Sequence, residues 1–183
     1  MNTDRFWRWV DSSHGLEHIE EFMMVLAQGL GRLDVNLIEE YQSLCNSLKL
    51  PLEERNLIEE SMKLSELLTL SYLWVLGAYE LARAVNQRLV ENTELLGGQV
   101  RTRVAEVKHA FERLRIPLAK FEASKRQRET DSHIAYPAIH RELGISWQLS
   151  SDVLVSRREL ADHLLGIIEE ICSASDLRPD KSA

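Results

Sequence analysis

The chain has 183 residues, of which 44% are hydrophobic and 28% are charged, and its formal net charge is −7 at neutral pH. This length is typical of one domain with a sizeable core, and the low counts of glycine (8) and proline (4) favour helices over a turn-rich β fold. The acidic balance argues against a protein that coats nucleic acid. We therefore expect an all-α or nearly all-α fold, an antiparallel bundle of about four main helices.

The two cysteines and the N-terminal residues bear on cellular location. Residues 1–14 mix charged with apolar side chains and contain no uninterrupted apolar run, so we expect no secretory signal peptide. Cys45 and Cys172 both fall in expected helices beside apolar positions, which is typical of buried thiols rather than of a disulfide. Together these features predict a cytoplasmic protein.

The first long helix is expected between about Ser13 and Leu48. Apolar residues repeat there every three or four positions, a spacing typical of a helix that packs along one seam. Ser13 is a suitable N-cap, and Gly29 and Gly31 can break or bend the helix near residue 31. Ahead of it, we expect a short first turn that begins at Thr3 and closes one end of the bundle with its aromatic residues.

The most apolar part of the chain is residues 67–79, a run of thirteen without a charge. A helix here is hydrophobic on nearly every face, which indicates that other helices surround it. Thirteen residues fall short of the roughly 20 needed to cross a bilayer, so no membrane association is expected. Pro51 is expected near the start of this central helix, which ends near Leu96 and forms an antiparallel hairpin with the helix before it.

The remaining elements are a third helix, an insertion and a last helix. Apolar spacing over residues 100–121 predicts a helix that is kinked at Pro117. Residues 130–156 are the least helical part, and their loose alternation predicts a small irregular or β-hairpin insertion.

The last helix is expected to open with a capping box at Ser156 and Glu159. We expect the short tail after Cys172 to have nothing to bury. We therefore expect a single helical-bundle domain over residues 1–172 and a frayed tail over residues 173–183.

Basic residues gather in one segment of an otherwise acidic chain. Residues 98–128 hold nine Lys or Arg and three Asp or Glu, a net charge of +6, whereas residues 1–97 carry −8 and residues 129–183 carry −5. We expect the basic helix to pack beside acidic helices, and the alternative is an electropositive stripe that binds phosphate or RNA.

One enzymatic hypothesis comes from the spacing of arginine and histidine. Arg128 and His133 are separated by four residues, a spacing that resembles the R-x4–6-H motif of HEPN-type ribonucleases. That resemblance implies an all-helical, often dimeric protein in which the two residues position a scissile phosphate and assist attack by the 2′-hydroxyl without metal. The alternative is a solvated arginine and a loop histidine. The loose pattern also fits five other pairs: Arg158/His163, Arg8/His14, Arg103/His109, Arg126/His133 and Arg157/His163.

Three further groups of polar residues are candidates for function. A recognition surface for RNA bases or a partner protein is expected to combine basic and aromatic side chains: Tyr136, His140, Arg141, Trp147, Arg115, Lys125 and Arg126. Glu80 and Arg83, three positions apart on the central helix, are expected to form a structural ion pair, with a polar site inside the bundle as the alternative.

The sequence from His14 to His18 resembles the H-x-x-E-H motif of inverzincin metalloproteases. Its polar side chains are expected on the outer face of the helix, where a catalytic zinc lacks a cleft, so we expect no metal site.

The chain also lacks the P-loop, Rossmann, nucleophile-elbow and C-x-x-C patterns. The leading expectation is a cytoplasmic interaction protein that self-associates, without catalysis or cofactor; the alternative is the HEPN-like ribonuclease.

Overall fold

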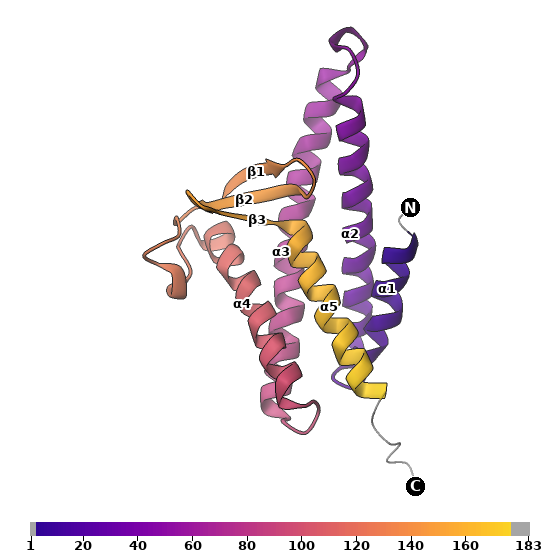
Figure 1. The fold of residues 1–183 in the computed structure, drawn as a ribbon, viewed down its shortest axis with the longest axis vertical. Coiled ribbons are helices and arrows are strands. Elements are labelled where there is room, and N and C mark those ends of the chain that lie inside the picture. Colours follow the sequence, from indigo (N-terminus) through magenta and orange to yellow (C-terminus); the bar gives the residue numbers. More distant parts are fainter. Residues whose placement is uncertain (1–2, 177–183) are drawn as a thin grey trace.

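The computed structural model of the protein describes residues 3–176, which are mostly helical (Figure 1). The prediction of a mainly helical chain with a small insertion before the last helix is confirmed. The helices and strands are α1 (Thr3–Ser13), α2 (Glu21–Ser47), α3 (Leu57–Glu91), α4 (Gly98–Lys120), β1 (Tyr136–His140), β2 (Gly144–Ser150), β3 (Val153–Ser156) and α5 (Arg157–Asp176).

The long helix α3 lies at the centre of the fold and contacts α2, α4 and α5. It begins after Asn56, whose side chain accepts a hydrogen bond from the backbone N–H of Glu59 at 3.2 Å. Trp74, Val75 and Ala78 from its uncharged stretch are fully buried. Leu73 in the same stretch is 52% exposed, so other helices cover most of this stretch but leave one part of its surface open.

The expected helix start at Ser13 is wrong, because the chain turns between α1 and α2. Residues His14–Leu16 form a 3-10 turn, and Glu20 is extended at φ −165° and ψ 125° before α2 begins at Glu21. At this turn the backbone of Gly15 lies against α5: an added Cβ would be 2.4 Å from the Cα of Cys172. The turn lets α1 pack on both α2 and α5, which a helix continuing along the predicted seam could not do.

Helix α2 runs without a break through Gly29 and Gly31, so the predicted break near residue 31 is wrong. The absence of a side chain at Gly31 serves packing instead. A Cβ there would lie 2.4 Å from Cβ and Cγ of Trp9, so α1 approaches α2 at this point with the indole directly over the glycine.

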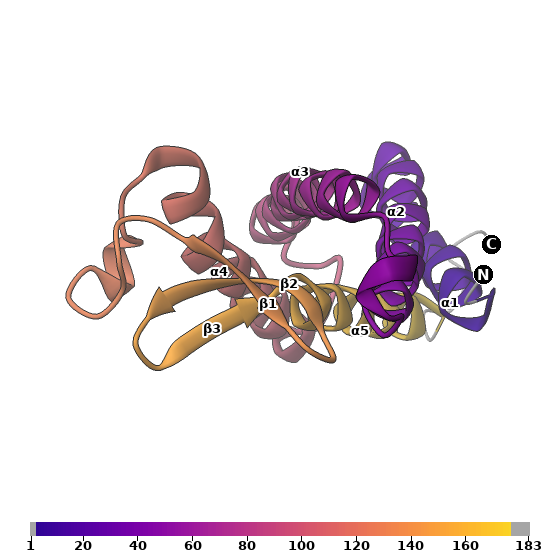
Figure 2. The same ribbon diagram turned by 90° about the horizontal axis from the view of Figure 1, so that it is seen from above.

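Helix α4 contains Pro117, as expected, and ends at Lys120 with Phe121 in the left-handed region (φ 56°). The insertion that follows is larger than a hairpin: three antiparallel strands in the order β1–β2–β3, of which β1 was not predicted. Figure 2 shows the sheet lying across the N-terminal end of α5.

The sheet leads directly into α5 through the predicted capping box, which is confirmed. The Ser156 hydroxyl accepts the backbone N–H of Glu159 at 3.0 Å, and the Glu159 carboxylate accepts the backbone N–H of Ser156 at 3.2 Å. Helix α5 continues to Asp176, so residues 173–176 are helical, and the rest of the predicted tail lies outside the described residues. No helix in the described part of the chain is long and apolar enough to span a membrane.

Candidate functional site

The basic side chains of α4 are largely paired within the protein. Four of them lie beside carboxylates: Arg103 beside Glu170, Lys108 beside Glu112 at 3.2 Å, Arg113 beside Asp131 at 2.7 Å, and Arg115 beside Glu80 at 4.0 Å. The guanidinium of Arg115 also lies 4.9 Å from the centre of the Tyr79 ring. Glu170, Asp131 and Glu80 lie on other segments and Glu112 lies on α4 itself, so most of the positive charge of α4 is paired. The loop after α4 carries further basic residues.

That loop, residues 120–128, is named here the basic loop. It carries four basic residues and one acidic residue, a net charge of +3, and Lys120, Lys125, Arg126 and Arg128 are all exposed. Phe121 is exposed among them. Two hydrogen bonds of 2.7 and 2.8 Å from Arg113 to Asp131 fix the end of the chain segment that follows the loop.

The predicted catalytic pair lies at the end of the basic loop. Arg128 and His133 are both exposed, and no hydrogen bond or ion pair joins them within residues 3–176. The acidic Glu129 beside them is exposed as well. The hypothesis that two copies bring this pair together stays a prediction.

The predicted aromatic and basic recognition surface is only partly at the surface. Tyr136 and Arg141 are exposed, but Trp147 is 2% exposed and belongs to the core. His140 has a local role, because its Nδ1 accepts the backbone N–H groups of Glu142 at 3.2 Å and Leu143 at 3.1 Å. Trp147 and His140 therefore stabilise the sheet and its turn.

The remaining polar candidates lie in solvent. Arg83 Nε donates to Glu80 at 2.7 Å, and both side chains are about half exposed, so the pair adds little stability. His14 is exposed and lies 3.1 Å from Glu17. Within residues 3–176, no group of three His, Cys, Asp or Glu side chains is arranged to hold a metal ion.

A polar network that was not predicted lies in the core and centres on Asp34 of α2. This carboxylate is fully buried and accepts hydrogen bonds from Arg5 Nε at 2.6 Å, Trp9 Nε1 at 3.1 Å and Arg157 Nη1 at 2.5 Å. Burial opposes ionisation of Asp34, but its attraction to Arg157 and Arg5 is stronger and lowers its pKa. One signal in the sequence could have indicated this network: Asp34 lies three and four positions from Gly31 and Ile38, on the same face of α2.

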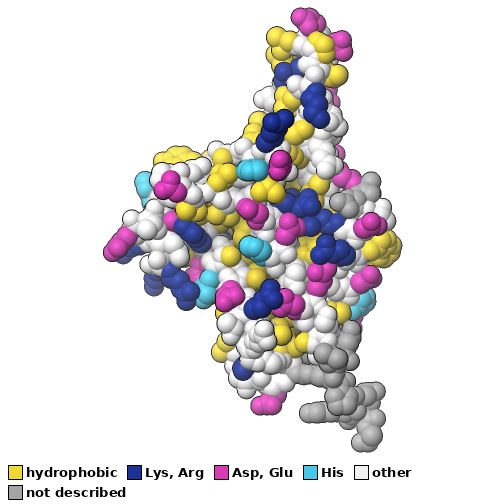
Figure 3. Space-filling model, in the orientation of Figure 1, with side chains coloured by type: hydrophobic (Ala, Val, Ile, Leu, Met, Phe, Trp, Pro, Cys, Tyr) yellow, Lys and Arg dark blue, Asp and Glu magenta, His cyan; other side chains and the backbone are white. Residues whose placement is uncertain are grey.

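The α2–α3 hairpin extends beyond the rest of the fold and exposes apolar side chains near its end (Figures 1 and 3). We name residues 48–66 the hairpin tip. Its exposed large hydrophobic residues are Leu48, Leu50, Leu52, Leu57, Ile58 and Met62. Residues 36–66 contain seven acidic and three basic residues, a net charge of −4. The surface is therefore both apolar and acidic.

Two adjoining hollows continue this surface along the hairpin. Carboxylates line them together with apolar side chains: Glu40, Glu59 and Glu66 with Ile58, Met62, Leu67 and Leu70. Lys63, the one basic residue in their lining, is already paired with Glu40 at 2.7 Å. Such a surface suits a partner that brings both apolar contact and positive charge.

Comparisons of the chain with protein-family models, with curated proteins and with solved structures found no match in any of the three.

Proposed function

We propose that this protein is a cytoplasmic interaction protein that self-associates and has no catalytic activity of its own. Its helices form an antiparallel bundle that serves as a scaffold for two binding surfaces, the hairpin tip and the basic loop. The single observation that carries the proposal is the protruding α2–α3 hairpin with six large hydrophobic residues exposed near its end. Ile58, for example, is 75% exposed.

The occupant of the hairpin tip is a second copy of the chain, bound through its basic loop. The tip offers apolar side chains with a net charge of −2 over residues 48–66, and the hairpin carries −4 over residues 36–66. The basic loop offers +3 together with exposed Phe121. Tyr136 and Ile139 of β1 add exposed apolar area near that loop. Charge complementarity therefore favours tip-to-loop contact over contact between two acidic tips.

The two surfaces lie on separate parts of one molecule, as the magenta and yellow tip and the blue side chains of the basic loop in Figure 3 show. One copy thus presents both halves of the contact. Because the contact joins two different surfaces, repeated association closes into a ring or extends as a chain of copies.

Complementary charge reversal tests this contact. We expect gel filtration with light scattering to show a mass above the monomer for the wild type. Glu59→Lys with Glu66→Lys should give monomers, and so should Lys125→Glu with Arg126→Glu. Mixing the two variants should restore association, because the unaltered tip of one variant meets the unaltered loop of the other and the reversed tip meets the reversed loop. A single protein that carries all four substitutions should also associate, and only through the reversed contact. The matched control is Glu17→Lys with Glu21→Lys, which changes the net charge equally at exposed positions outside the hairpin tip.

Two results would contradict the proposal. One is a wild type that stays monomeric at every concentration tested. The other is a loop-reversal variant that assembles normally but loses binding to single-stranded RNA, which would assign the basic loop to nucleic acid instead.

A further inference from the structure

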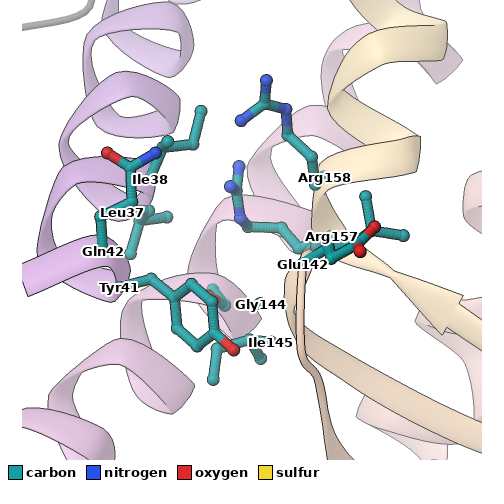
Figure 4. A pocket seen from close by; sticks show the side chains of 11 residues that line it. Leu37, Ile38, Tyr41, Gln42, Glu142, Gly144, Ile145, Arg157 and Arg158 are labelled. Carbon is teal, nitrogen blue, oxygen red and sulfur yellow. The ribbon is translucent and has the colours of Figure 1, made fainter. Parts of the chain in front are cut away.

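A small cavity lies where α2, α3, the β1–β2 turn and the start of α5 meet. Its volume is about 50 Å³. Figure 4 shows Tyr41 and Gln42 on the α2 side and the guanidinium groups of Arg157 and Arg158 reaching into the space from α5. This cavity is separate from the hairpin tip and the basic loop, so the proposed self-association makes no use of it.

The arginine closest to the core is held in place by its neighbours. Arg157 is buried, donates from Nη1 to Asp34, and has its guanidinium carbon 5.3 Å from the centre of the Trp74 ring. A guanidinium group carries four further N–H donors beyond the one used at Asp34. Burial lowers the pKa of Arg157 even though Asp34 acts in the opposite direction, so a further negative charge nearby would stabilise the cation.

Each of the two arginines that line the cavity has one carboxylate beside it: Asp34 beside Arg157, and the half-exposed Asp162 beside Arg158 at 3.4 Å. Each guanidinium group has more N–H donors than one such contact uses. Glu142 also lines the cavity, but its side chain is exposed and lies away from the two guanidinium groups in Figure 4. The cavity also faces the first turn of the 20-residue helix α5, where the helix dipole favours negative charge.

An independent observation also points to a ligand. Ser71 of α3 lines the same cavity and is 1% exposed, and its hydroxyl has no hydrogen-bond partner among the described residues. A buried hydroxyl without a partner costs free energy, and bound ligand oxygen atoms are one means of satisfying it.

We propose that this cavity binds a small tetrahedral oxyanion, phosphate or sulfate. Arg157 and Arg158 supply charge-assisted hydrogen bonds, and Ser71 donates its hydroxyl. The size allows a small ligand: a cavity needs at least about 10–15 Å³ to hold one water, so 50 Å³ has room for more than one water-sized group.

The test is an NMR titration of the ¹⁵N-labelled full chain with sodium phosphate, followed through the arginine Nε–Hε signals. Sodium sulfate is the second arm, and sodium chloride at equal ionic strength is the control. We expect saturable shifts at Arg157 and Arg158 with phosphate or sulfate and none with chloride. Arg158→Gln should weaken the affinity about tenfold, because it removes a charged donor.

Two more variants keep the test independent of folding. Ser71→Ala removes only the unpartnered hydroxyl, so the fold should survive while the affinity falls about threefold. Arg141→Gln, at an exposed arginine of the same turn that does not line the cavity, should bind as the wild type does. Shifts that never saturate or that chloride reproduces would show an adventitious ion only. That result, or wild-type affinity in Arg158→Gln, would overturn the proposal.

Discussion

Arg157 of α5 and Asp34 of α2 lie 123 positions apart in the chain and form a buried ion pair in the middle of the fold. The same carboxylate also accepts a hydrogen bond from Arg5 of α1. Asp34 thus joins α1, α2 and α5. The guanidinium of Arg157 also lies over the ring of Trp74, which connects α3 to the same network. Because a buried charge is tolerated only when it is paired, this network specifies how the four helices meet.

Asp34→Asn should be among the most damaging substitutions in the chain. It keeps the shape of the side chain but leaves Arg5 and Arg157 without their shared anion in the core. We expect a loss of about 3–5 kcal/mol in the free energy of unfolding, measured by urea denaturation at pH 7. The matched control is Asp162→Asn, which removes a half-exposed partner of Arg5 and should cost at most about 1 kcal/mol. Equal losses in the two variants would contradict this role for Asp34.

The same carboxylate should make stability depend on acid pH. The pKa of Asp34 is held below its ordinary value of 3.8, so its contribution is present above that pH and is lost as pH falls through the lower value in the folded protein. Wild-type protein should therefore lose stability in this acidic range more steeply than Asp34→Asn. Parallel pH profiles for the melting temperatures of the two proteins would show that Asp34 does not supply this dependence.

Two glycines of α2 should respond in opposite directions to alanine. Gly31→Ala places a Cβ 2.4 Å from the Trp9 side chain, so α1 must move, and we expect a loss of about 1–3 kcal/mol. Gly29→Ala meets nothing within 4 Å and should add up to about 1 kcal/mol through helix propensity. Thermal unfolding followed by circular dichroism measures both. A Gly31→Ala protein as stable as the wild type would contradict the close approach of α1.

Tyr41 should connect the sheet to α2. Its hydroxyl donates to the backbone carbonyl of His140 at 3.0 Å and lies 3.2 Å from that of Arg141. Its ring packs against Gly144, whose φ of +82° and close contact both disfavour a side chain. Tyr41→Phe keeps the ring and should cost about 1 kcal/mol in urea unfolding at pH 8. The control is Tyr136→Phe at an exposed position, which should cost nothing measurable.

Alkaline pH gives a second check on Tyr41. Burial and the contact with Cys45 raise its pKa to about 12 from 10.0, so its contribution is complete below pH 10 and is lost as pH rises towards 12. Tyr41→Phe should therefore lose less stability than the wild type across this range. If the two proteins lose the same amount of stability between pH 10 and pH 12, Tyr41 does not supply this pH dependence.

The proposal of a non-catalytic protein predicts that RNA stays intact. We expect wild-type protein to leave structured and single-stranded RNA uncleaved, with and without divalent metal, as measured on denaturing gels. His133→Ala should unfold at the same temperature as the wild type, because the imidazole is exposed. Cleavage by the wild type that His133→Ala abolishes would establish the ribonuclease hypothesis instead.

The local features of this protein follow from sequence. The uncharged stretch of α3, the capping box at Ser156 and the paired strands β2 and β3 each depend on residues close together in the chain, so spacing and side-chain type predict them. Strand β1 was not predicted because Tyr136–His140 shows no regular alternation of apolar and polar residues and contains a proline. Its pairing with β2 holds it in the sheet.

Only the tertiary structure decided which polar residues meet. Asp34, Arg5 and Arg157 come from three distant segments, and nothing local marks them as partners. The same holds for the turn before α2. The apolar spacing from residue 13 is compatible with a continuous helix. The close contacts of Gly15 with Cys172 and of Gly31 with Trp9 favour a separate α1 instead. Local spacing determines the helices, whereas long-range burial and charge pairing determine where they end and how they meet.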